Sequence, residues 1–393
     1  MRILCLTSRL PYPPDRGDRL RAFHFIEHLA REHELELISF IARDSEREYL
    51  APLQGYCQRV QVLRMGPRRS ALTVFGNLWR REPLQALYYR SGEMQRLVDR
   101  ALAKGQFDIV YVHLFRMAPY VAGRSDLYRV VDLTDVISEE VALSMPYRRL
   151  AWRLLYGLEK PRIERYERYV ADAFEETWLI SDADRRVLAA RCPRANIQVV
   201  TNGVDTEQFR PTGQPCEPNS LIFVGHLRVF HNVDAVTHLV RDVLPLIRKE
   251  IPDVRLDIVG ANPGPKVQQL GDAPGVTVVG FVPDLNEYLN RAAVFVAPLR
   301  FAAGVQNKVL EAMAAGRPVV TTSLVNVGLC ANPGQELFVA DDAEPMAERV
   351  VALLRDGELG RRIGRAGREF VERTYNWGRV VERMGEIERI LSA

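Results

Sequence analysis

The sequence has no hydrophobic segment long enough to cross a membrane. No stretch approaches the ~18 consecutive apolar residues that a spanning helix needs. The apolar run at the N-terminus, residues 3–6, is too short for a signal peptide before the charged and proline-rich residues that follow it. We therefore expect a cytoplasmic protein that is soluble or peripherally attached to the inner face of a membrane.

Cysteine is scarce, and no sign of charge dominates. The chain has 5 cysteines, without a CxxC pair or a Cys/His ligand spacing, so the sequence predicts neither a disulfide framework nor a zinc site. The 53 Lys+Arg against 50 Asp+Glu give a formal net charge of +3. This near balance excludes wholesale binding to nucleic acid, and we expect no nucleic-acid partner.

The glycine fingerprint of dinucleotide-binding enzymes is also missing. Residues 11–21, PYPPDRGDRLR, follow the first expected strand and lack the GxGxxG that lets a pyrophosphate approach the backbone, which disfavours an NAD-dependent enzyme. Gly17 precedes a helix expected over 18–31 with Asp18 as its cap, and it leaves room for a phosphate or sugar at that helix start. A rigid proline-rich turn explains Gly17 equally well.

The sequence does contain a regular alternation of short apolar runs and longer helical segments, which is typical of parallel sheets covered by helices. In the first half the expected strands are 2–8, 34–41, 58–65, 107–113, 128–132, 175–180 and 196–200. In the second half they are 220–224, 254–259, 276–279, 293–297 and 317–321. The predicted fold class is therefore α/β, with two doubly wound domains in tandem.

Residues 201–218 concentrate Gly, Pro and Asn between the two domains. We place the first domain at 1–203 and the second at 204–375. The tail 343–393 is continuously helical in pattern, with a break near 375–377, and we expect the last helix, 376–393, to pack back on the first domain.

Ligands of open α/β sheets bind outside the carboxyl ends of the strands. His113 ends an expected strand there, and its imidazole can donate or accept a hydrogen bond near neutral pH. A structural histidine is the alternative. In the second domain, Gly225 ends the first strand, followed by His226, Arg228 and His231, which can supply positive charge or donors to a ligand. We expect at least one of the three to be a solvated loop residue instead.

The segment 297–318 is the most informative. A strand ends near Pro298, a loop containing Gly304 follows, and a helix expected over 307–315 ends at Gly316. Lys308 in the first turn opposes the helix dipole at a cost of roughly 0.3–1 kcal/mol, which makes sense if a phosphate binds there. Arg300 and Lys308 would then neutralise the anion, backbone N–H groups from Gly304 to Gln306 would bind it, and Glu311 would accept hydrogen bonds from vicinal hydroxyls such as those of a ribose. The alternative is a Lys308–Glu311 surface pair.

Three further segments carry weaker signals. Residues 280–284, Gly-Phe-Val-Pro-Asp, offer backbone edges to a base or form an ordinary capped turn. Asp182-Ala183-Asp184 resembles a metal-binding DxD, but we expect Ser181 to cap a helix there. Residues 64–90 contain six arginines and a single carboxylate, interleaved with apolar residues and Trp79, which suits an anionic membrane surface or a lipid-linked acceptor. A solvated charged face is the alternative.

With these motifs read, the chain resembles the retaining glycosyltransferases of family 4 type. The run Asn-Lys-Val-Leu-Glu-Ala-Met-Ala-Ala-Gly-Arg-Pro-Val-Val resembles their donor-site motif, and the likeness covers nearly the whole chain. Within the family it is similar to the sugar-transferase subgroup associated with exosortase and exopolysaccharide loci. The resemblance implies the GT-B architecture, with a Rossmann-like acceptor-side domain and a Rossmann-like nucleotide-sugar donor domain facing across a cleft.

The resemblance also implies roles for individual residues. Glu311 would bind the nucleotide ribose, Lys308 and the loop of Gly304 and Val305 the diphosphate, and the Val282 backbone the base. Gly17 would lie near the diphosphate or sugar, and His113, as the catalytic-site histidine, near the transferred sugar. Such enzymes generally need no metal or other cofactor, because cationic side chains and helix dipoles stabilise the leaving diphosphate.

The chain departs from this pattern at three positions. Ala303 stands where the family has a glutamate, seven residues before its second acidic residue at Glu311, and His226 and His231 stand where it has Arg and Lys. Histidine carries less charge at neutral pH, for which Arg228, Arg300 and Lys308 can compensate.

The resemblance, together with the residues that carry it, implies a metal-independent retaining hexosyltransferase. It would move a sugar from a UDP- or GDP-linked donor to a glycan or lipid-linked acceptor in exopolysaccharide or cell-surface glycan biosynthesis. Two alternatives share the architecture: a nucleotide-sugar 2-epimerase and a catalytically silent partner subunit.

Overall fold

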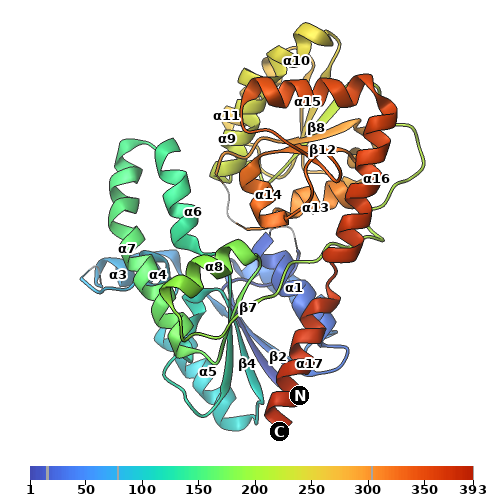
Figure 1. Cartoon of the computed structure of the whole chain (residues 1–393). Coiled ribbons are helices and arrows are strands. Elements are labelled where there is room, and N and C mark those ends of the chain that lie inside the picture. Colours follow the sequence, from blue (N-terminus) through green and yellow to red (C-terminus); the bar gives the residue numbers. More distant parts are fainter. Residues whose placement is uncertain (15–16, 78, 302–303, 393) are drawn as a thin grey trace. The chain divides into compact units, whose positions relative to one another are not determined.

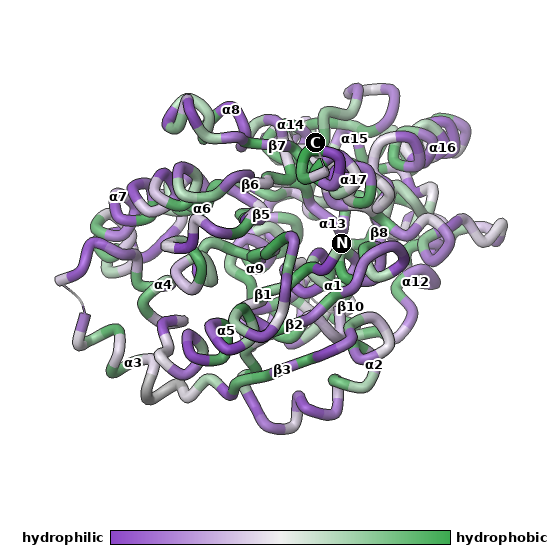
Figure 2. The backbone as a smooth tube through the Cα atoms, turned by 90° about the horizontal axis from the view of Figure 1, so that it is seen from below, coloured by the Kyte–Doolittle hydropathy of each residue, from purple (hydrophilic) through white to green (hydrophobic). Residues whose placement is uncertain are grey.

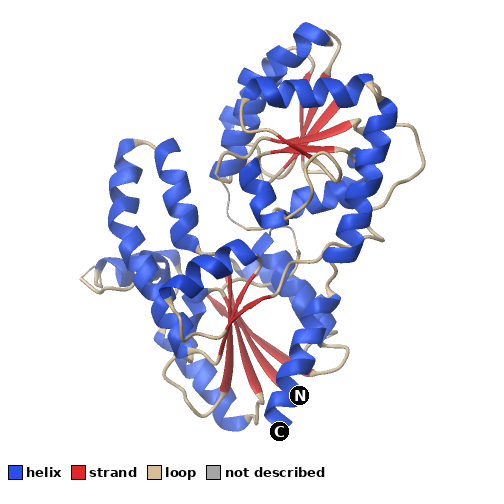
Figure 3. Ribbon diagram, in the orientation of Figure 1, coloured by secondary structure: helices blue, strands red, loops and turns tan. Residues whose placement is uncertain are grey.

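The computed structural model describes residues 1–14, 17–77, 79–301 and 304–392, and the chain forms two compact units. Unit 1 comprises Met1–Thr201 and Trp377–Ala393, and unit 2 comprises Asn202–Asn376. Each unit is a parallel β-sheet with helices on both faces, as Figure 3 shows. The predicted α/β class with two doubly wound sheets is confirmed.

The sheet of unit 1 has seven parallel strands in the order β3-β2-β1-β4-β5-β6-β7. They are β1 (Arg2–Thr7), β2 (Glu34–Ile41), β3 (Arg59–Arg64), β4 (Ile109–His113), β5 (Tyr128–Thr134), β6 (Glu176–Leu179) and β7 (Ile197–Val199). The strand order reverses between β1 and β4, which pair directly from Ile3 with Ile109 to Thr7 with His113. Ligands of open sheets bind at such a switch point.

Alternating side chains of β1 build the two cores of unit 1. Ile3 and Cys5 belong to one buried cluster and Leu4 and Leu6 to the other, because successive residues of a strand point to opposite faces. Both faces are buried, so the strand is apolar on both sides. Figure 2 shows β1 mostly green, whereas the surface helix α16 (Gly357–Thr374) is largely purple with interspersed green.

The helices of unit 1 cover both faces of this sheet. They are α1 (Gly17–Leu29), α2 (Leu50–Gln54), α3 (Pro67–Phe75), α4 (Leu84–Tyr88), α5 (Gly92–Lys104), α6 (Ile137–Ser144), α7 (Leu150–Ala173), α8 (Asp182–Arg191) and α17 (Gly378–Ser392), with short 3-10 turns at Asp44–Tyr49, Phe115–Tyr120 and Met145–Tyr147.

The C-terminal helix α17 belongs to unit 1 although it follows unit 2 in the chain. It packs beside α1, as Figure 1 shows, and its Met384 and Ile387 are fully buried in the same core as Ile3. Trp377, just before α17, stacks on His24 of α1 with ring centroids 4.6 Å apart. The first and last helices are therefore joined through one hydrophobic cluster.

The sheet of unit 2 has six parallel strands in the order β10-β9-β8-β11-β12-β13, with the reversal between β8 and β11. They are β8 (Ser220–Val224), β9 (Arg255–Val259), β10 (Val276–Gly280), β11 (Val294–Ala297), β12 (Val319–Thr321) and β13 (Phe338–Val339). The other helices are α9 (Phe230–His238), α10 (Leu244–Glu250), α11 (Pro265–Gln268), α12 (Leu285–Arg291), α13 (Asn307–Ala314), α14 (Ser323–Leu329) and α15 (Ala343–Arg355), with a π-helical turn at Leu239–Val243 and a 3-10 turn at Gln269–Asp272.

Every expected strand is present, but two expectations about helices are wrong. Asp18 does not cap α1, because the helix already includes Gly17 and the Asp18 carboxylate accepts a 2.6 Å hydrogen bond from Arg9. The tail is not continuously helical before residue 375, since Asp356 ends α15 and caps α16 by accepting from the N–H groups of Glu358 and Leu359.

Candidate functional site

The switch point of unit 2 brings together the two segments that the sequence singled out. Gly225 follows β8, and the loop from Pro298 to Gln306 leads from β11 into α13. Because β8 and β11 are neighbours in the sheet, both segments leave the same edge, where doubly wound sheets bind their ligands. Asn202, at the start of unit 2, donates a 2.9 Å hydrogen bond to the Asn307 side chain and so reaches the first residue of α13.

Lys308 is the central cation of this edge. Its ammonium donates to the side-chain oxygens of Asn232 (2.7 Å) and Gln306 (3.1 Å). No ion pair joins Lys308 to Glu311 among the described residues, so the surface-pair alternative is wrong. The charge is held by neutral amides, which leaves it available to an anion at the start of α13, where the helix dipole and the first N–H groups also favour negative charge.

Burial shifts the pKa of Lys308 and of two neighbouring groups, Glu311 and His231. Desolvation lowers the pKa of Lys308 to about 8, although nearby Glu311 opposes the shift. Desolvation raises the pKa of the Glu311 carboxyl to about 7, with Lys308 again opposing. Burial and the neighbouring Lys308 charge lower the pKa of His231 to about 3, so this imidazole is neutral at pH 7 and does not supply the positive charge that we considered for it.

Glu311 lies one turn deeper on α13 and is half-buried. Its carboxylate has no hydrogen-bond or ion-pair partner in the part of the chain that the structure describes. A carboxylate in this state can accept hydrogen bonds from a pair of ligand hydroxyls, as predicted for a ribose.

Asn232 is a site residue that the sequence reasoning missed. It is 4% exposed, accepts from Lys308 and donates to the backbone oxygen of His226 (3.2 Å). A Cβ on Gly225 would lie 2.8 Å from the Asn232 side-chain carbon, so the glycine leaves room for this amide. Its position on the first turn of α9, seven residues after Gly225, was the only available signal.

Arg300 is engaged more locally than expected. Its guanidinium donates to both carboxylate oxygens of Asp234 on α9, at 2.7 and 2.9 Å. This bidentate ion pair joins the loop after β11 to α9. His226 accepts from the Arg228 N–H at 3.4 Å and is half-buried, whereas the Arg228 side chain is exposed.

The loop at Gly304 has a backbone shape that requires glycine. Gly304 has φ +61°, in the left-handed region, and a Cβ on Gly328 of α14 would lie 2.6 Å from its carbonyl oxygen. Val305 is buried, so only its backbone can meet a ligand. Ala303, the departure from the family pattern, lies outside the described residues.

Val282 follows β10 at the same edge of the sheet and is half-buried. Gly280 before it has φ +83°, and Asp284 after it caps α12 by accepting from the N–H groups of Asn286 and Glu287. The capped-turn interpretation is correct for Asp284, and it leaves the backbone at Val282 open to the predicted role.

Unit 1 carries a second polar strand edge around His113. In the sheet His113 pairs with Thr7 on one side and Asp132 on the other. Asp132 accepts from Arg21 (2.7 Å) and Tyr111 (2.6 Å), all fully buried. Burial lowers the pKa of His113 to about 4, so the ring is neutral at pH 7. Gly17 opens α1 after the neighbouring strand β1.

Several polar atoms at this edge have no protein partner. The buried atoms His113 Nε2, Thr7 Oγ1 and Thr134 Oγ1 lack a hydrogen bond within the described ranges. Leu114 and Thr134, which follow β4 and end β5, have positive φ angles of 71° and 70°. Strained backbone and unsatisfied polar groups cost free energy that is commonly retained where a ligand binds.

The acidic pair at Asp182 and Asp184 is structural. The Ser181 hydroxyl accepts from the Asp184 N–H at 3.1 Å, which confirms the helix cap, and Asp182 bonds Arg185 and Arg186. Within the described residues, one group has ligand atoms close enough for a metal ion: His24, Glu27 and His28 on α1. His24 there is bonded to Glu27 and stacked on Trp377, so packing explains the group.

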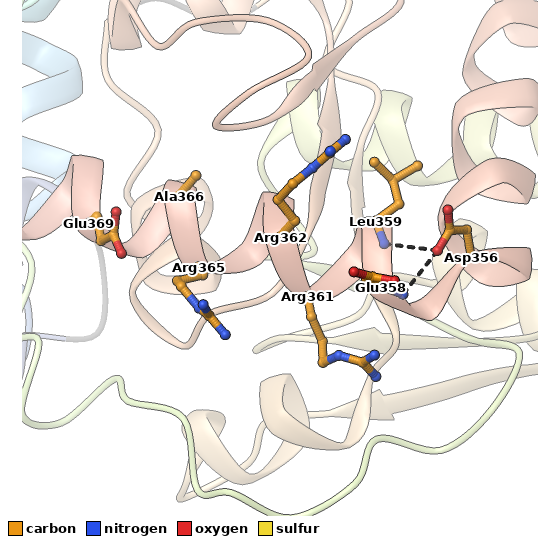
Figure 4. Close-up of a pocket in the computed structure, with 8 residues that line it drawn as sticks. All are labelled: Asp356, Glu358, Leu359, Arg361, Arg362, Arg365, Ala366 and Glu369. Atoms are coloured by element: carbon orange, nitrogen blue, oxygen red, sulfur yellow. Dashed lines mark hydrogen bonds between the residues drawn. The ribbon is translucent and has the colours of Figure 1, made fainter.

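A surface hollow along α16 is not a candidate site. Figure 4 shows its lining, which comes from one helix and its cap and includes Arg361, Arg362 and Arg365. None of these residues was predicted to bind a ligand, and a single helix provides no second wall.

The described helices include none that is both long and apolar enough to span a bilayer.

Comparison with known proteins finds a family model that matches part of the chain. Residues 218–356 match the family model of the Glycosyl transferases group 1. The chain is 23% identical over 390 residues to an uncharacterized 44.6 kDa protein in the cps region of Klebsiella pneumoniae. The aligned region covers 95% of this chain and 96% of that protein. It is 25% identical over 367 residues to the phosphatidyl-myo-inositol mannosyltransferase of Mycobacterium leprae, with 90% and 91% covered.

Solved structures share the whole fold. The sucrose-phosphate synthase of Thermosynechococcus elongatus superimposes with a TM-score of 0.74 at 16% identity, covering 100% of this chain and 99% of that one. HepE of Anabaena in complex with UDP gives a TM-score of 0.70 at 15% identity, covering 99% and 100%.

Proposed function

We propose, from the GT-B fold of this chain and its group 1 glycosyltransferase domain, that it is a retaining hexosyltransferase acting on a UDP- or GDP-linked sugar. One observation carries the proposal. At the switch point of unit 2, the Lys308 ammonium is held by two amide oxygens beside a helix start, and the unpartnered Glu311 carboxylate lies one turn further along.

The two groups match the two parts of a nucleotide diphosphate. Lys308 and the first N–H groups of α13 would bind the diphosphate, whose charge offsets the unfavourable position of a cation at a helix N-terminus. Glu311 would accept from the two ribose hydroxyls. The backbone around Gly304 and Val305 would complete the diphosphate site, and that at Val282 would contact the base.

The chemistry needs no strong protein base. In a front-face displacement the bond between the anomeric carbon and the diphosphate breaks, and the acceptor oxygen bonds that carbon from the same side. The acceptor proton moves to the departing diphosphate. Lys308 and the α13 dipole stabilise the charge that develops on the diphosphate, and neutral His113 in unit 1 would hydrogen-bond the transferred sugar.

The proposed setting is the synthesis of an exopolysaccharide or cell-surface glycan, with a glycan or lipid-linked acceptor. The relative from the cps region of Klebsiella pneumoniae supports this setting, as does the resemblance to the exosortase-associated subgroup. HepE, a structural neighbour, is a protein known in complex with UDP.

Calorimetry with a panel of UDP- and GDP-sugars tests the proposal. We expect one donor class to bind, and Lys308→Ala and Glu311→Ala each to weaken its binding about 10- to 100-fold, because each removes charge-assisted hydrogen bonds. Lys249→Ala and Glu348→Ala, which make the same changes at exposed positions of α10 and α15, should leave binding unchanged.

Product analysis with the donor that binds completes the test. Transfer to an added acceptor supports the proposal, whereas conversion of the donor alone would identify a 2-epimerase. Binding of no nucleotide sugar at all would refute it.

A further inference from the structure

We propose that unit 1 docks on an anionic lipid bilayer through two arginine-rich segments that carry exposed apolar side chains: the α3 segment, residues 64–81 without the undescribed residue 78, and the hairpin tip, residues 141–158. The sequence pointed only to the first. The second becomes visible in the structure, where α6 and α7 form a helical hairpin (Figure 1). This inference goes beyond the proposed transfer reaction and does not require it.

The hairpin tip exposes an unusual amount of apolar surface. Leu150, Leu154 and Leu158 of α7 are 70%, 64% and 72% exposed, and Trp152 is 52% exposed. Leucines four residues apart form a row along one side of a helix, and Trp152 lies off that row. The first turns of α7 therefore present apolar side chains that no other described element of unit 1 covers.

The rest of α7 is anchored, so the tip is a defined part of the fold. From Ile163 onward the helix buries Tyr166 and Val170 in the core of unit 1. The buried Glu159 lies between the exposed tip and the buried part of α7. Its carboxylate accepts from the Leu84 N–H at 2.7 Å and from Arg162 at 3.0 Å. Leu84 begins α4, the neighbour of α3, so the same contact links the α3 segment to the root of the hairpin.

The α3 segment also exposes apolar side chains. Leu72, Phe75 and Trp79 are 72%, 75% and 76% exposed. Figures 1 and 2, which differ by a quarter turn, both show α3 and α7 on the same side of unit 1.

The positive charge of the two segments favours an anionic surface as their binding partner. The α3 segment has 5 arginines and the hairpin tip 3, and neither contains Asp, Glu or Lys. Arg64 and Arg80 pair with neighbouring carboxylates, Asp44 and Glu82. Arg81, Arg149 and Arg153 have no ion-pair partner among the residues described, so their positive charge is uncompensated.

This combination suits a bilayer better than a second copy of the chain. Exposed Trp and Leu side chains can enter the boundary between headgroups and acyl chains while arginines reach the phosphates. Each basic residue near an anionic leaflet contributes about 1 kcal/mol to binding. In a two-fold symmetric dimer, two copies of this arginine-rich surface without carboxylates would instead face each other.

Flotation with lipid vesicles tests the proposal on the full chain. We expect binding to vesicles of phosphatidylcholine mixed with phosphatidylglycerol, little binding to phosphatidylcholine alone, and loss of binding at high salt. The double variant Arg149→Glu/Arg153→Glu should bind at least about 10-fold more weakly, and Leu154→Ser/Leu158→Ser should also bind more weakly. The matched control is Arg361→Glu/Arg362→Glu on exposed positions of α16, which should bind as the unaltered chain does.

Two results would overturn the proposal. One is equal binding of the Arg149→Glu/Arg153→Glu variant and the unaltered chain to anionic vesicles, with circular dichroism showing both folded. The other is a dimer, detected by light scattering, that Leu154→Ser/Leu158→Ser dissociates. Nucleotide-sugar binding should also be measured on the same variants, because the proposed donor site lies in unit 2 and the substitutions lie in unit 1. Failure of membrane binding is therefore distinguishable from failure of the proposed transfer function.

Discussion

At the scale of single residues, Lys308 has the clearest physical signature in unit 2. It is a cation whose nearest partners are the neutral amides of Asn232 and Gln306, and burial lowers its pKa to about 8. Removing an ammonium from water without a carboxylate to pair it costs free energy. A bound diphosphate would recover that free energy by raising the pKa again.

The pH dependence of nucleotide binding follows from this pKa. Above pH 7 the Glu311 carboxyl is mostly ionised and can accept from the ribose, so the loss of the Lys308 proton controls affinity there. Affinity should be highest between pH 7 and 8 and should fall as the pH rises from 8 to 9, by up to about 10-fold per pH unit above the Lys308 pKa. Calorimetry of the diphosphate nucleotide at pH 7, 8 and 9 measures this.

The same experiment contains its own check. Near pH 8 binding should take up a fraction of a proton, visible as a heat that varies with the ionisation enthalpy of the buffer. Lys308→Met should bind more weakly at pH 7 and lose both the fall above pH 8 and the proton uptake. A Lys308→Met variant that retains them would place the titrating group elsewhere.

At the scale of elements, the position of α13 depends on glycines of α16. A Cβ on Gly364 would lie 2.2 Å from the carbonyl oxygen of Gly316, the residue with φ +70° two positions after the end of α13. A Cβ on Gly367 would lie 2.8 Å from the backbone carbonyl oxygen of Glu336. These contacts are with backbone, which cannot rotate away as a flexible side chain does. The close packing of α16 therefore supports the helix that carries Lys308 and Glu311.

We predict that Gly364→Ala destabilises unit 2 by about 1–3 kcal/mol, because the added methyl forces the two backbones apart. Gly385→Ala makes the same change inside α17, where no atom beyond the adjacent residues and the local helix backbone lies within 4 Å of the new Cβ. It should stabilise by about 0.5–1 kcal/mol through helix propensity alone. Thermal melting of the two variants gives the comparison. Equal shifts would show that the packing of α16 does not matter.

At the scale of the whole molecule, unit 1 is built from both ends of the chain. Arg383 of α17 donates to both oxygens of Glu176 on β6, each at 2.7 Å. Glu176 is fully buried and also accepts from the Trp178 indole at 2.6 Å. The last helix therefore supplies the cation that balances a carboxylate inside the sheet, in addition to the apolar Met384 and Ile387.

Replacing Arg383 should destabilise unit 1 selectively. Arg383→Met leaves the Glu176 carboxylate buried without a cation, which costs about 3–5 kcal/mol. Hydrogen exchange followed by mass spectrometry should show faster exchange in β6 and α17 and unchanged exchange in the strands of unit 2.

Arg389→Met is the matched control on the same helix, because the exposed Arg389 bonds only the Gly385 carbonyl in the described chain. Its exchange should equal that of the unaltered protein. Uniform acceleration across both units in Arg383→Met would contradict the assignment of α17 to unit 1.

The sequence by itself determined the local features of this protein. The apolar runs placed all the expected strands, because a strand buried on both faces must be apolar along its length. Ser181 identified a helix start and Gly316 a helix end, because capping depends on neighbours in the chain. The same local patterns placed Gly225 and the Gly304 loop after strands of one doubly wound sheet, and Lys308 in the helix that follows that loop.

Only the tertiary structure decided which side chains meet and which remain uncovered. Asn232 holds Lys308, Arg300 is paired with Asp234, and Arg383 returns to Glu176, because partners far apart in the chain are selected by sheet topology. Burial, which sets the pKa values of Lys308 and His231, also depends on every surrounding layer. Leu150 and Leu154 are apolar residues, and they are exposed because no other described element of unit 1 covers the end of the hairpin.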